Sequence, residues 1–249
     1  MAGHSQFKNI MHRKGAQDAK RAKLFTKLGR ELTVAAKEGG DDPDSNPRLR
    51  TAIINARSKN MPKDNMERAI KRGLGGGGDN NYESMRYEGY GPSGIAIIVE
   101  ALTENRNRTA SEIRTIFTKL NGNMGETGSV SFMFDHMGHF HFPFASGSHD
   151  EVFDKALDAG AEDIESNAEG HNIYCSREKF TSVREDLEKS LENLESSALI
   201  WKPKTIEIIK DEEKAKAILR LIDALEDNDD VQNVYANFSF SPELEKIIT

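Results

Sequence analysis

The chain has 249 residues, with 34 Lys and Arg against 41 Asp and Glu, which gives a formal net charge of −7. Its one cysteine cannot form an internal disulfide or a cysteine-based zinc site, and this cysteine usage fits a reducing compartment. No apolar run approaches the roughly 18 residues of a membrane helix, and the N-terminus lacks the apolar stretch of a secretory signal. We therefore expect a cytoplasmic protein with no membrane partner.

The charge is divided unevenly along the chain. Residues 1–75 carry 17 Lys and Arg against 8 Asp and Glu, and residues 76–249 carry 17 against 33, so the two parts sum to about +9 and −16. This asymmetry is typical of a protein in which one end faces nucleic acid and the body does not. Residues 1–14 are mostly polar and offer little apolar surface to pack, so we expect them to order on a partner.

The pattern over residues 18–38 predicts a helix, which Asp18 would cap. Phe25, Leu28, Leu32 and Ala35 recur at spacings of three and four and form its apolar face. Cations follow the same rhythm on the other side and have almost no acidic partners at i+4: Lys20, Lys23, Lys27, Arg30 and Lys37. One face of the helix is thus predicted to pack against the protein. For the basic face, phosphate binding is a better interpretation than mere exposure to solvent.

Two shorter helices are predicted next, one capped at Asn46-Pro47 and one started by Met61-Pro62 and ended near Gly73. Together the three helices predict a small unit with a basic exterior. The spacing leaves open whether its phosphates belong to DNA, messenger RNA or ribosomal RNA. The candidate nucleic-acid-binding residues are His4, Lys8, His12, Arg13, Lys14, Lys20, Arg21, Lys23, Lys27, Arg30, Lys37, Arg57, Lys59, Lys63, Lys71 and Arg72.

Beyond the glycine-rich linker, strands and helices alternate. Residues 138–203 read βαββαβ, a complete ferredoxin-like module. The strand–helix–strand pieces at 95–135 and 205–238 are each half of a module, with strands at 129–135 and 205–209. We therefore predict an α+β fold in which a helical domain precedes two ferredoxin-like domains, one inserted in the other. The predicted domains are 1–80, 81–137 plus 204–249, and 138–203.

Three further motifs could carry chemistry: a histidine cluster, an arginine pair and a glycine-rich segment. His136, His139 and His141 are the best metal candidates, but hydrogen-bonded packing is the better interpretation because no clear further ligand is present. Arg106 and Arg108 are auxiliary phosphate contacts or merely part of a helix start capped by Asn107 or Thr109. The glycine-rich segment lacks the lysine of a phosphate-binding loop. No catalytic constellation is evident, so we expect no enzyme, no metal and no cofactor.

From residue 2 to the C-terminus the chain resembles the YebC family. The matching motifs include Ala2-Gly-His-Ser5, His12-Arg-Lys14, Phe25-Thr-Lys-Leu28, Asn60-Met-Pro-Lys-Asp-Asn65, Tyr87-Glu-Gly-Tyr-Gly-Pro92, Asn105-Arg-Asn-Arg-Thr109 and Gly128-Ser-Val130. Phe7 and Phe132 stand where the family usually has tryptophan. The resemblance is highly specific to about residue 135, and beyond that it rests on the order of elements.

This resemblance implies three domains, as the nested pattern does. It also implies a probable DNA-binding transcriptional regulator, while mitochondrial relatives are translational activators of cytochrome oxidase. The chain begins at the signature without a transit peptide, which favours a bacterial, cytosolic member. We therefore predict a non-enzymatic, nucleic-acid-binding regulator of gene expression. The alternative is an RNA- or ribosome-associated translation factor, and a metal- or small-molecule-binding enzyme is a weaker third reading.

Overall fold

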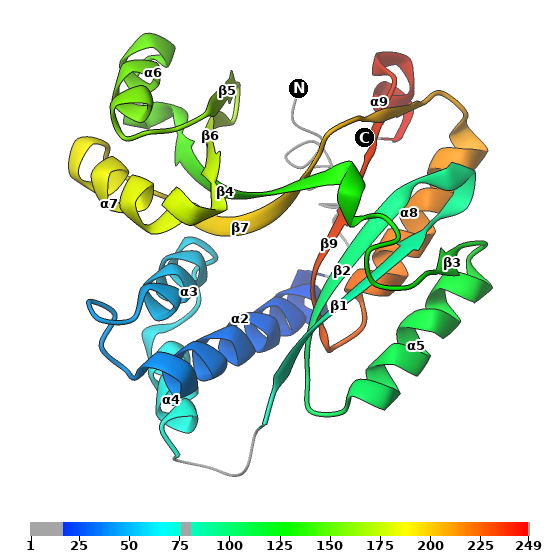
Figure 1. Cartoon of the computed structure of the whole chain (residues 1–249), viewed down its shortest axis with the longest axis horizontal. Coiled ribbons are helices and arrows are strands. Elements are labelled where there is room, and N and C mark those ends of the chain that lie inside the picture. The colour runs from blue at the N-terminus through cyan, green and yellow to red at the C-terminus, as the bar shows by residue number, and fades with distance from the viewer. Residues whose placement is uncertain (1–16, 76–80, 249) are drawn as a thin grey trace. The chain divides into compact units, whose positions relative to one another are not determined.

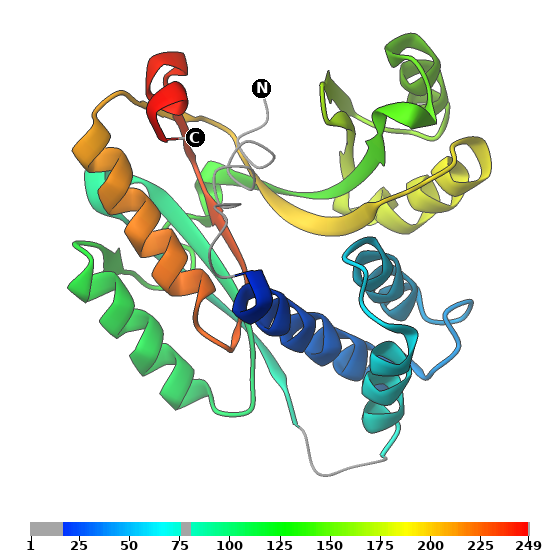
Figure 2. The same ribbon diagram turned by 180° about the vertical axis from the view of Figure 1, so that it is seen from behind.

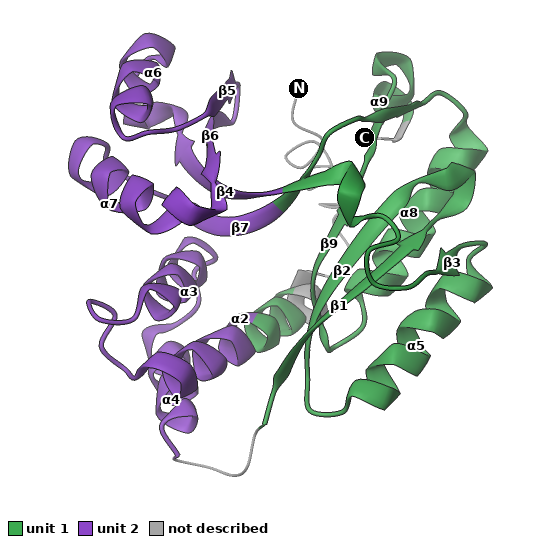
Figure 3. Cartoon of the chain, in the orientation of Figure 1, with its two compact units in different colours: residues 1–27, 80–135, 201–249 green, residues 28–79, 136–200 purple. Residues whose placement is uncertain are grey.

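The computed structural model describes residues 17–75 and 81–248, and it is an α+β protein (Figure 1). It divides into two compact units (Figure 3). The first unit contains residues 1–27, 80–135 and 201–249, and the second contains residues 28–79 and 136–200. The predicted domain boundaries stay a prediction. Among the helices of the described residues, none combines the length and apolar character that crossing a bilayer requires.

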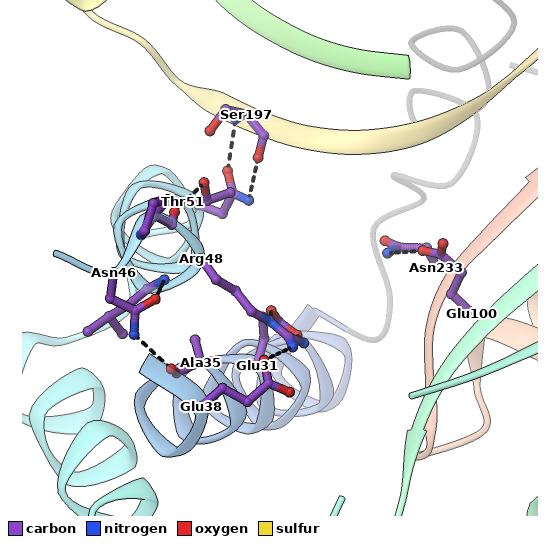
Figure 4. Close-up of polar contacts among 12 residues, drawn as sticks. Glu31, Ala35, Glu38, Asn46, Arg48, Thr51, Glu100, Ser197 and Asn233 are labelled. Atoms are coloured by element: carbon purple, nitrogen blue, oxygen red, sulfur yellow. Dashed lines mark hydrogen bonds and ion pairs between the residues drawn. The ribbon is translucent and has the colours of Figure 1, made fainter. Parts of the chain in front are cut away.

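The three predicted N-terminal helices are present as α2 (Gln17–Gly39), α3 (Pro47–Ser58) and α4 (Lys63–Gly73). Asn46 caps α3 as predicted, because its Oδ1 accepts a hydrogen bond of 3.0 Å from the Leu49 N–H. Its Nδ2 donates to the Ala35 carbonyl at 2.8 Å, so the same side chain also joins α3 to α2 (Figure 4). Both ends of the α2–α3 connection are thus held by one buried residue.

The sheet of the second unit has the predicted βαββαβ order. Its strands are β4 (Phe134–Pro143), β5 (Asp163–Asn167), β6 (Gly170–Ser176) and β7 (Ser196–Pro203), and its helices are α6 (His149–Asp158) and α7 (Phe180–Ser190). The strands lie in the order β5-β6-β4-β7. This is the ferredoxin-like arrangement, with the first and third strands of the motif paired at the centre. Phe140, Phe142, Ile173 and Leu187 are fully buried in its core.

Helix α3 is fastened to the edge of this sheet. The Asn55 amide pairs with the peptide groups of Ser197 on edge strand β7: Asn55 Nδ2 donates to the Ser197 carbonyl at 2.9 Å, and the Ser197 N–H donates to Asn55 Oδ1 at 3.1 Å (Figure 4). A side-chain amide carries the same donor and acceptor as a peptide, so it can satisfy groups that an edge strand leaves unpaired. The helical segment and the sheet of the second unit are therefore directly hydrogen-bonded.

The sheet of the first unit contains two strands that the sequence pattern does not predict, at residues 83–90 and 123–124. Its order is β3 (Asn123–Met124), β1 (Glu83–Tyr90), β2 (Ala96–Thr103) and β9 (Val231–Ala236). Helices α5 (Arg106–Lys119) and α8 (Glu212–Glu226) lie side by side on one face, as both views show (Figures 1 and 2). The spatial arrangement repeats that of the second unit, but β1 fills the place that the prediction gave to residues 205–209.

The strand predicted at 205–209 is present at residues 207–209 but lies in a different sheet, and most of the strand predicted at 129–135 is absent. Strand β8 (Glu207–Ile209) pairs in parallel with β10 (Phe238–Phe240) in a separate two-stranded sheet, which α9 (Pro242–Ile248) follows. Most of the stretch 129–135 is not a strand, because residues 131–133 form a 3-10 turn before β4 begins. The reason is Glu88 on β1, whose carboxylate is buried and accepts the N–H groups of Val130 and Ser131 at 2.9 and 2.8 Å.

We predict that Glu88→Gln lowers the free energy of unfolding at neutral pH by roughly 1 to 3 kcal/mol. The amide keeps one oxygen for the Val130 and Ser131 N–H groups but loses the negative charge, and its NH2 group then faces Arg86 Nε, which lies 3.1 Å from the other carboxylate oxygen. Burial alone would raise the pKa of Glu88, but hydrogen bonds from the Val130, Gly128 and Ser131 backbone and the charge of Arg86 outweigh it and lower the pKa. The carboxylate therefore stabilises the fold above its unfolded pKa of about 4.3, and this contribution is lost as pH falls through the lower, folded pKa.

Urea titrations of both proteins at several pH values test this prediction. The stability difference between the wild type and the variant should shrink as pH falls below about 4, because the wild-type carboxyl group then becomes protonated. A difference that stayed constant down to the acid limit would show that Glu88 does not act through its charge.

Candidate nucleic-acid interface

Two of the predicted phosphate-binding cations of α2 already have partners in the first unit. Lys23 Nζ lies 2.9 Å from Asp227 Oδ1, and Lys27 Nζ donates to the Glu226 carbonyl at 2.6 Å. Both partners lie at the C-terminal end of α8, where carbonyl groups lack intrahelical donors and cations are favoured. Burial against this end is the main reason that the pKa of Lys27 is lowered. Lys23 and Lys27 therefore bind the protein itself.

The remaining cations at the start of α2 are only partly described. Arg21 is exposed, and its guanidinium lies 5.3 Å from the centre of the Phe25 ring. The side chain of Lys20, and all of His4, Lys8, His12, Arg13 and Lys14, lie outside the described residues. Arg30 is half-buried and Lys37 is exposed, and both interact with other groups of the chain. The predicted stripe is therefore not one uniform solvent-facing surface.

Two acidic side chains of α2, Glu31 and Glu38, form ion pairs with one arginine of α3. Arg48 forms a two-pronged ion pair with Glu31, with Nε–Oε1 and Nη2–Oε2 distances of 2.7 and 3.0 Å, and its Nη1 lies 2.6 Å from Glu38 Oε2 (Figure 4). Burial opposes the charge of Arg48, but the hydrogen bonds and charges of the two glutamates raise its pKa. This paired geometry is the strong form of a carboxylate–guanidinium contact.

The cations at the ends of α3 and α4 are differently placed. Arg57, Lys59, Lys71 and Arg72 are exposed, and within the described residues none of the four forms an ion pair. Lys63 is exposed as well and lies 3.5 Å from Glu67, a surface pair of the kind that contributes little. We call Arg57, Lys59, Lys63, Lys71 and Arg72 the α3–α4 cations.

Close packing brings the end of α4 against α2. Thr33 Oγ1 donates to the Ala69 carbonyl at 2.9 Å, and a Cβ at Gly73 would lie 2.3 Å from the Thr33 carbonyl oxygen and 3.1 Å from the Lys37 N. Lys71 and Arg72 are therefore close in space to Lys37 of α2, although they lie far from it in the sequence. Lys63 lies about 12 Å away along the helix axis, given a rise of 1.5 Å per residue.

The two auxiliary arginines stabilise the first unit. Arg108 Nη2 lies 3.0 Å from Oδ2 of the buried Asp230, and the same oxygen accepts from Thr103 and Thr109 Oγ1 at 3.1 and 2.6 Å. Arg106 Nε lies 3.6 Å from Glu83. The helix start is capped by Asn105, which accepts from the Arg108 N–H, and not by Asn107 or Thr109 as predicted. Arg106 and Arg108 thus have partners within the protein, and their presence in the sequence is explained without a phosphate ligand.

The histidines considered for a metal lie on β4 and face an asparagine. His139 Nε2 and His141 Nδ1 lie 3.0 and 3.2 Å from Oδ1 of Asn172 on the neighbouring strand β6, and His141 Nε2 lies 3.5 Å from Glu195. Within residues 17–75 and 81–248, no three or more His, Cys, Asp or Glu side chains are grouped to hold an ion. The packing interpretation of this cluster therefore describes the observed contacts.

Two residues that position the α3–α4 cations were missed in the sequence. Arg48 carries the ion pairs to α2, and Arg184 of α7 is fully buried with Nη1 donating to the Pro47 carbonyl and to Thr51 Oγ1 at 3.1 and 2.8 Å. Arg184 lies on the same helical arc as Leu187 and Leu191, which is a detectable sign of burial. The sequence carries no comparable sign for the partners of Arg48.

Comparisons with known proteins cover almost the whole chain. A family model described as the TACO1/YebC protein N-terminal domain matches residues 5–76, and a transcriptional-regulator model described as the TACO1/YebC second and third domain matches residues 82–238. The structure is similar to the crystal structure of a conserved hypothetical protein, Aq1575, from Aquifex aeolicus. The TM-score is 0.83 with 46% sequence identity, over 94% of this chain and 97% of that one.

We predict that Lys27→Glu lowers the free energy of unfolding by roughly 1 to 3 kcal/mol, because it removes the donor to the Glu226 carbonyl and sets a carboxylate beside Asp227. Lys59→Glu makes the same charge change at an exposed, unpaired position and should stay within about 0.5 kcal/mol of the wild type. Chemical denaturation measures both. Equal effects of the two substitutions would contradict the assignment of Lys27 to the end of α8.

We also predict opposite effects of alanine at two glycines near the α2–α4 contact. Gly73→Ala should destabilise by about 1 to 3 kcal/mol, since its Cβ would meet the Thr33 carbonyl. Gly29→Ala, in the middle of α2, meets only Met61 Cε at 3.8 Å and Ala69 Cβ at 3.9 Å and should stabilise by about 0.5 to 1 kcal/mol. Thermal melts test the pair, and a stable Gly73→Ala variant would argue against the close α2–α4 approach.

Proposed function

We propose that this chain, which belongs to the TACO1/YebC family, is a non-enzymatic regulator of gene expression that binds nucleic acid through the α3–α4 cations. The family carries the name of a transcriptional regulator, which indicates a regulator-type function. Nucleic-acid binding is our proposal, and the α3–α4 surface is its physical basis. The N-terminal residues His4 to Lys14 are proposed to add contacts to it.

The observation that carries the proposal is an imbalance of partners in the helical region. Residues 28–75 contain 10 Lys and Arg and 7 Asp and Glu, so their net charge is modest. However, Glu31 and Glu38 are occupied by Arg48, and Asp44 lies 3.1 Å from Arg50. Arg57, Lys59, Lys71 and Arg72 are exposed and form no ion pair within the described residues, so their charges can attract phosphates, whose neutralisation dominates nucleic-acid affinity.

The exposed face of α4 bears on how such a ligand would be held. At 100° per residue, this face carries Asp64 and Glu67 between Lys63, Lys71 and Arg72. Acidic side chains within the face would meet phosphates on both sides if the helix lay in a DNA major groove. Contact with a phosphate backbone through the helix ends fits these charges better. This favours the second candidate function, an RNA- or ribosome-associated translation factor, over a promoter-reading regulator.

We predict that a variant with Arg57, Lys59, Lys71 and Arg72 all changed to Glu loses most nucleic-acid binding while it stays folded. Each phosphate contact removed should reduce the slope of log affinity against log salt by about 1. The matched control changes four exposed cations of the acidic regions to Glu: Lys155, Lys179, Lys214 and Arg220. Equal binding losses in both variants would refute the α3–α4 surface.

The nature of the nucleic acid needs a parallel experiment. The wild type should be titrated with promoter duplex and random duplex DNA at physiological salt, and sedimented with ribosomes. Co-sedimentation with ribosomes, without a preference between the two duplexes, would support a role as a translation factor and contradict a role as a promoter-reading regulator. Selective duplex binding without co-sedimentation would do the reverse.

A further inference from the structure

Helix α6 of the second unit exposes an apolar row. Phe153 and Leu157 are 41% and 53% exposed, one helical turn apart, and His149 precedes them by another turn. The same helix buries Val152 and Ala156 completely, so its core-facing side is complete without the row. The exposed row is therefore an additional apolar strip, and not an edge of the core.

The strip continues onto the neighbouring hairpin through specific contacts. The His149 ring lies 6.0 Å from the Phe153 ring, and His149 Nδ1 lies 2.9 Å from Ser166 Oγ on β5. Ser166 Oγ lies 2.8 Å from Nδ1 of the buried His171, on which Phe144 stacks at 5.5 Å while remaining 59% exposed. We call the exposed row of His149, Phe153 and Leu157 the α6 strip; Phe144 is linked to it through Ser166 and the buried His171.

Acidic residues follow the strip along the same helix. Asp150, Asp154 and Asp158 are all exposed and recur at i, i+4 and i+8, in the row next to His149, Phe153 and Leu157. In the described part of the chain none of these three aspartates forms an ion pair. The helix carries one basic residue, Lys155, which lies on the other side of the buried row. The strip is therefore apolar with a negative border.

This combination selects one class of partner. Contiguous exposed apolar side chains with a polar border mark interaction sites more often than scattered ones do. A row of carboxylates repels a phosphate backbone and favours Lys and Arg, so a nucleic acid is the wrong occupant. Apolar groups repeated at one helical turn match side chains of an amphipathic helix laid alongside.

We propose that the α6 strip is the docking surface for a lysine- or arginine-rich, amphipathic segment of a partner protein. Apolar side chains of the segment would cover Phe153 and Leu157, and its cations would pair with Asp154 and Asp158. This contact does not depend on the α3–α4 cations. It would let the second unit bind a protein and a nucleic acid independently.

The test uses the full-length protein and a fluorescein-labelled synthetic helical peptide. Leucines repeat in the peptide at spacings of three and four, and lysines fill the other positions. Phe153→Ser with Leu157→Ser should weaken binding about tenfold or more, because the apolar contact is lost. Asp154→Asn with Asp158→Asn should weaken it and reduce its salt dependence. The matched control, Glu185→Gln with Glu192→Gln, removes the same charge from exposed positions of the same unit and should leave affinity within about twofold.

The outcomes separate the alternatives. Equal weakening by the acidic pair and its control would overturn the proposal, because binding would then reflect net charge alone. So would a peptide with lysines but no leucines that binds as well as the amphipathic one, or a serine variant that binds unchanged. Dissociation of a wild-type dimer by the serine variant would assign the strip to a second copy of this chain. Loss of nucleic-acid binding in the serine variant would show that the α6 strip belongs to the nucleic-acid-binding surface. Either result would refute the proposal of a protein partner.

Discussion

The two-pronged ion pair between Arg48 and Glu31 is the contact on which the candidate interface depends. It joins α3 to α2, and together with Glu38 it places one positive charge beside two of the acidic side chains of α2. Breaking such a half-buried pair on one side leaves a charge without its partner, which costs more than an exposed pair contributes. Arg57, Lys59, Lys71 and Arg72, at the ends of α3 and α4, form no ion pair within the described residues.

The helical region is held from the other side by the sheet of the second unit. Asn55 completes the edge of β7 as another peptide group would, and Arg184 reaches the first turn of α3 from within the core. Both joints use polar groups with fixed directions, so they set the orientation of α3 as well as its position. An interface built from helix ends needs this precision, because its cations sit where helices would otherwise fray.

Much of the fold was predictable from local patterns. The Asn46 cap of α3, the start of α4 after Met61-Pro62 and the βαββαβ order of residues 138–203 were confirmed because they depend on short stretches of sequence. Strand β1 was missed because its alternation carries charged residues on one side, and Glu88 is buried there with a partner in a loop more than 40 residues later. That carboxylate also turned the predicted strand at 129–135 into a short turn.

The candidate site was predictable only in part, for the same physical reason. Helical phasing placed Lys23 and Lys27 on an unpartnered face, because charge pairing was tested only at i+4. Their partners lie 204 and 199 residues away at the end of α8, and no local pattern reveals them. Arg57, Lys59, Lys71 and Arg72 were correctly placed outside the helical core. What distinguishes them from Lys23 and Lys27 is the absence of an ion pair in the described residues, and the sequence does not reveal this difference.

Lysine acetylation footprinting of the wild-type protein, with and without nucleic acid, reports directly on whether the α3–α4 cations contact the ligand, because it measures the reactivity of each lysine separately. We expect nucleic acid to protect Lys59, Lys63 and Lys71, while Lys155, Lys179 and Lys189 react at the same rate as before. Lys27 should react slowly in both states, since it is already held at the end of α8. Unchanged reactivity of Lys59, Lys63 and Lys71 in a complex with demonstrated binding would contradict a contact between these cations and the ligand.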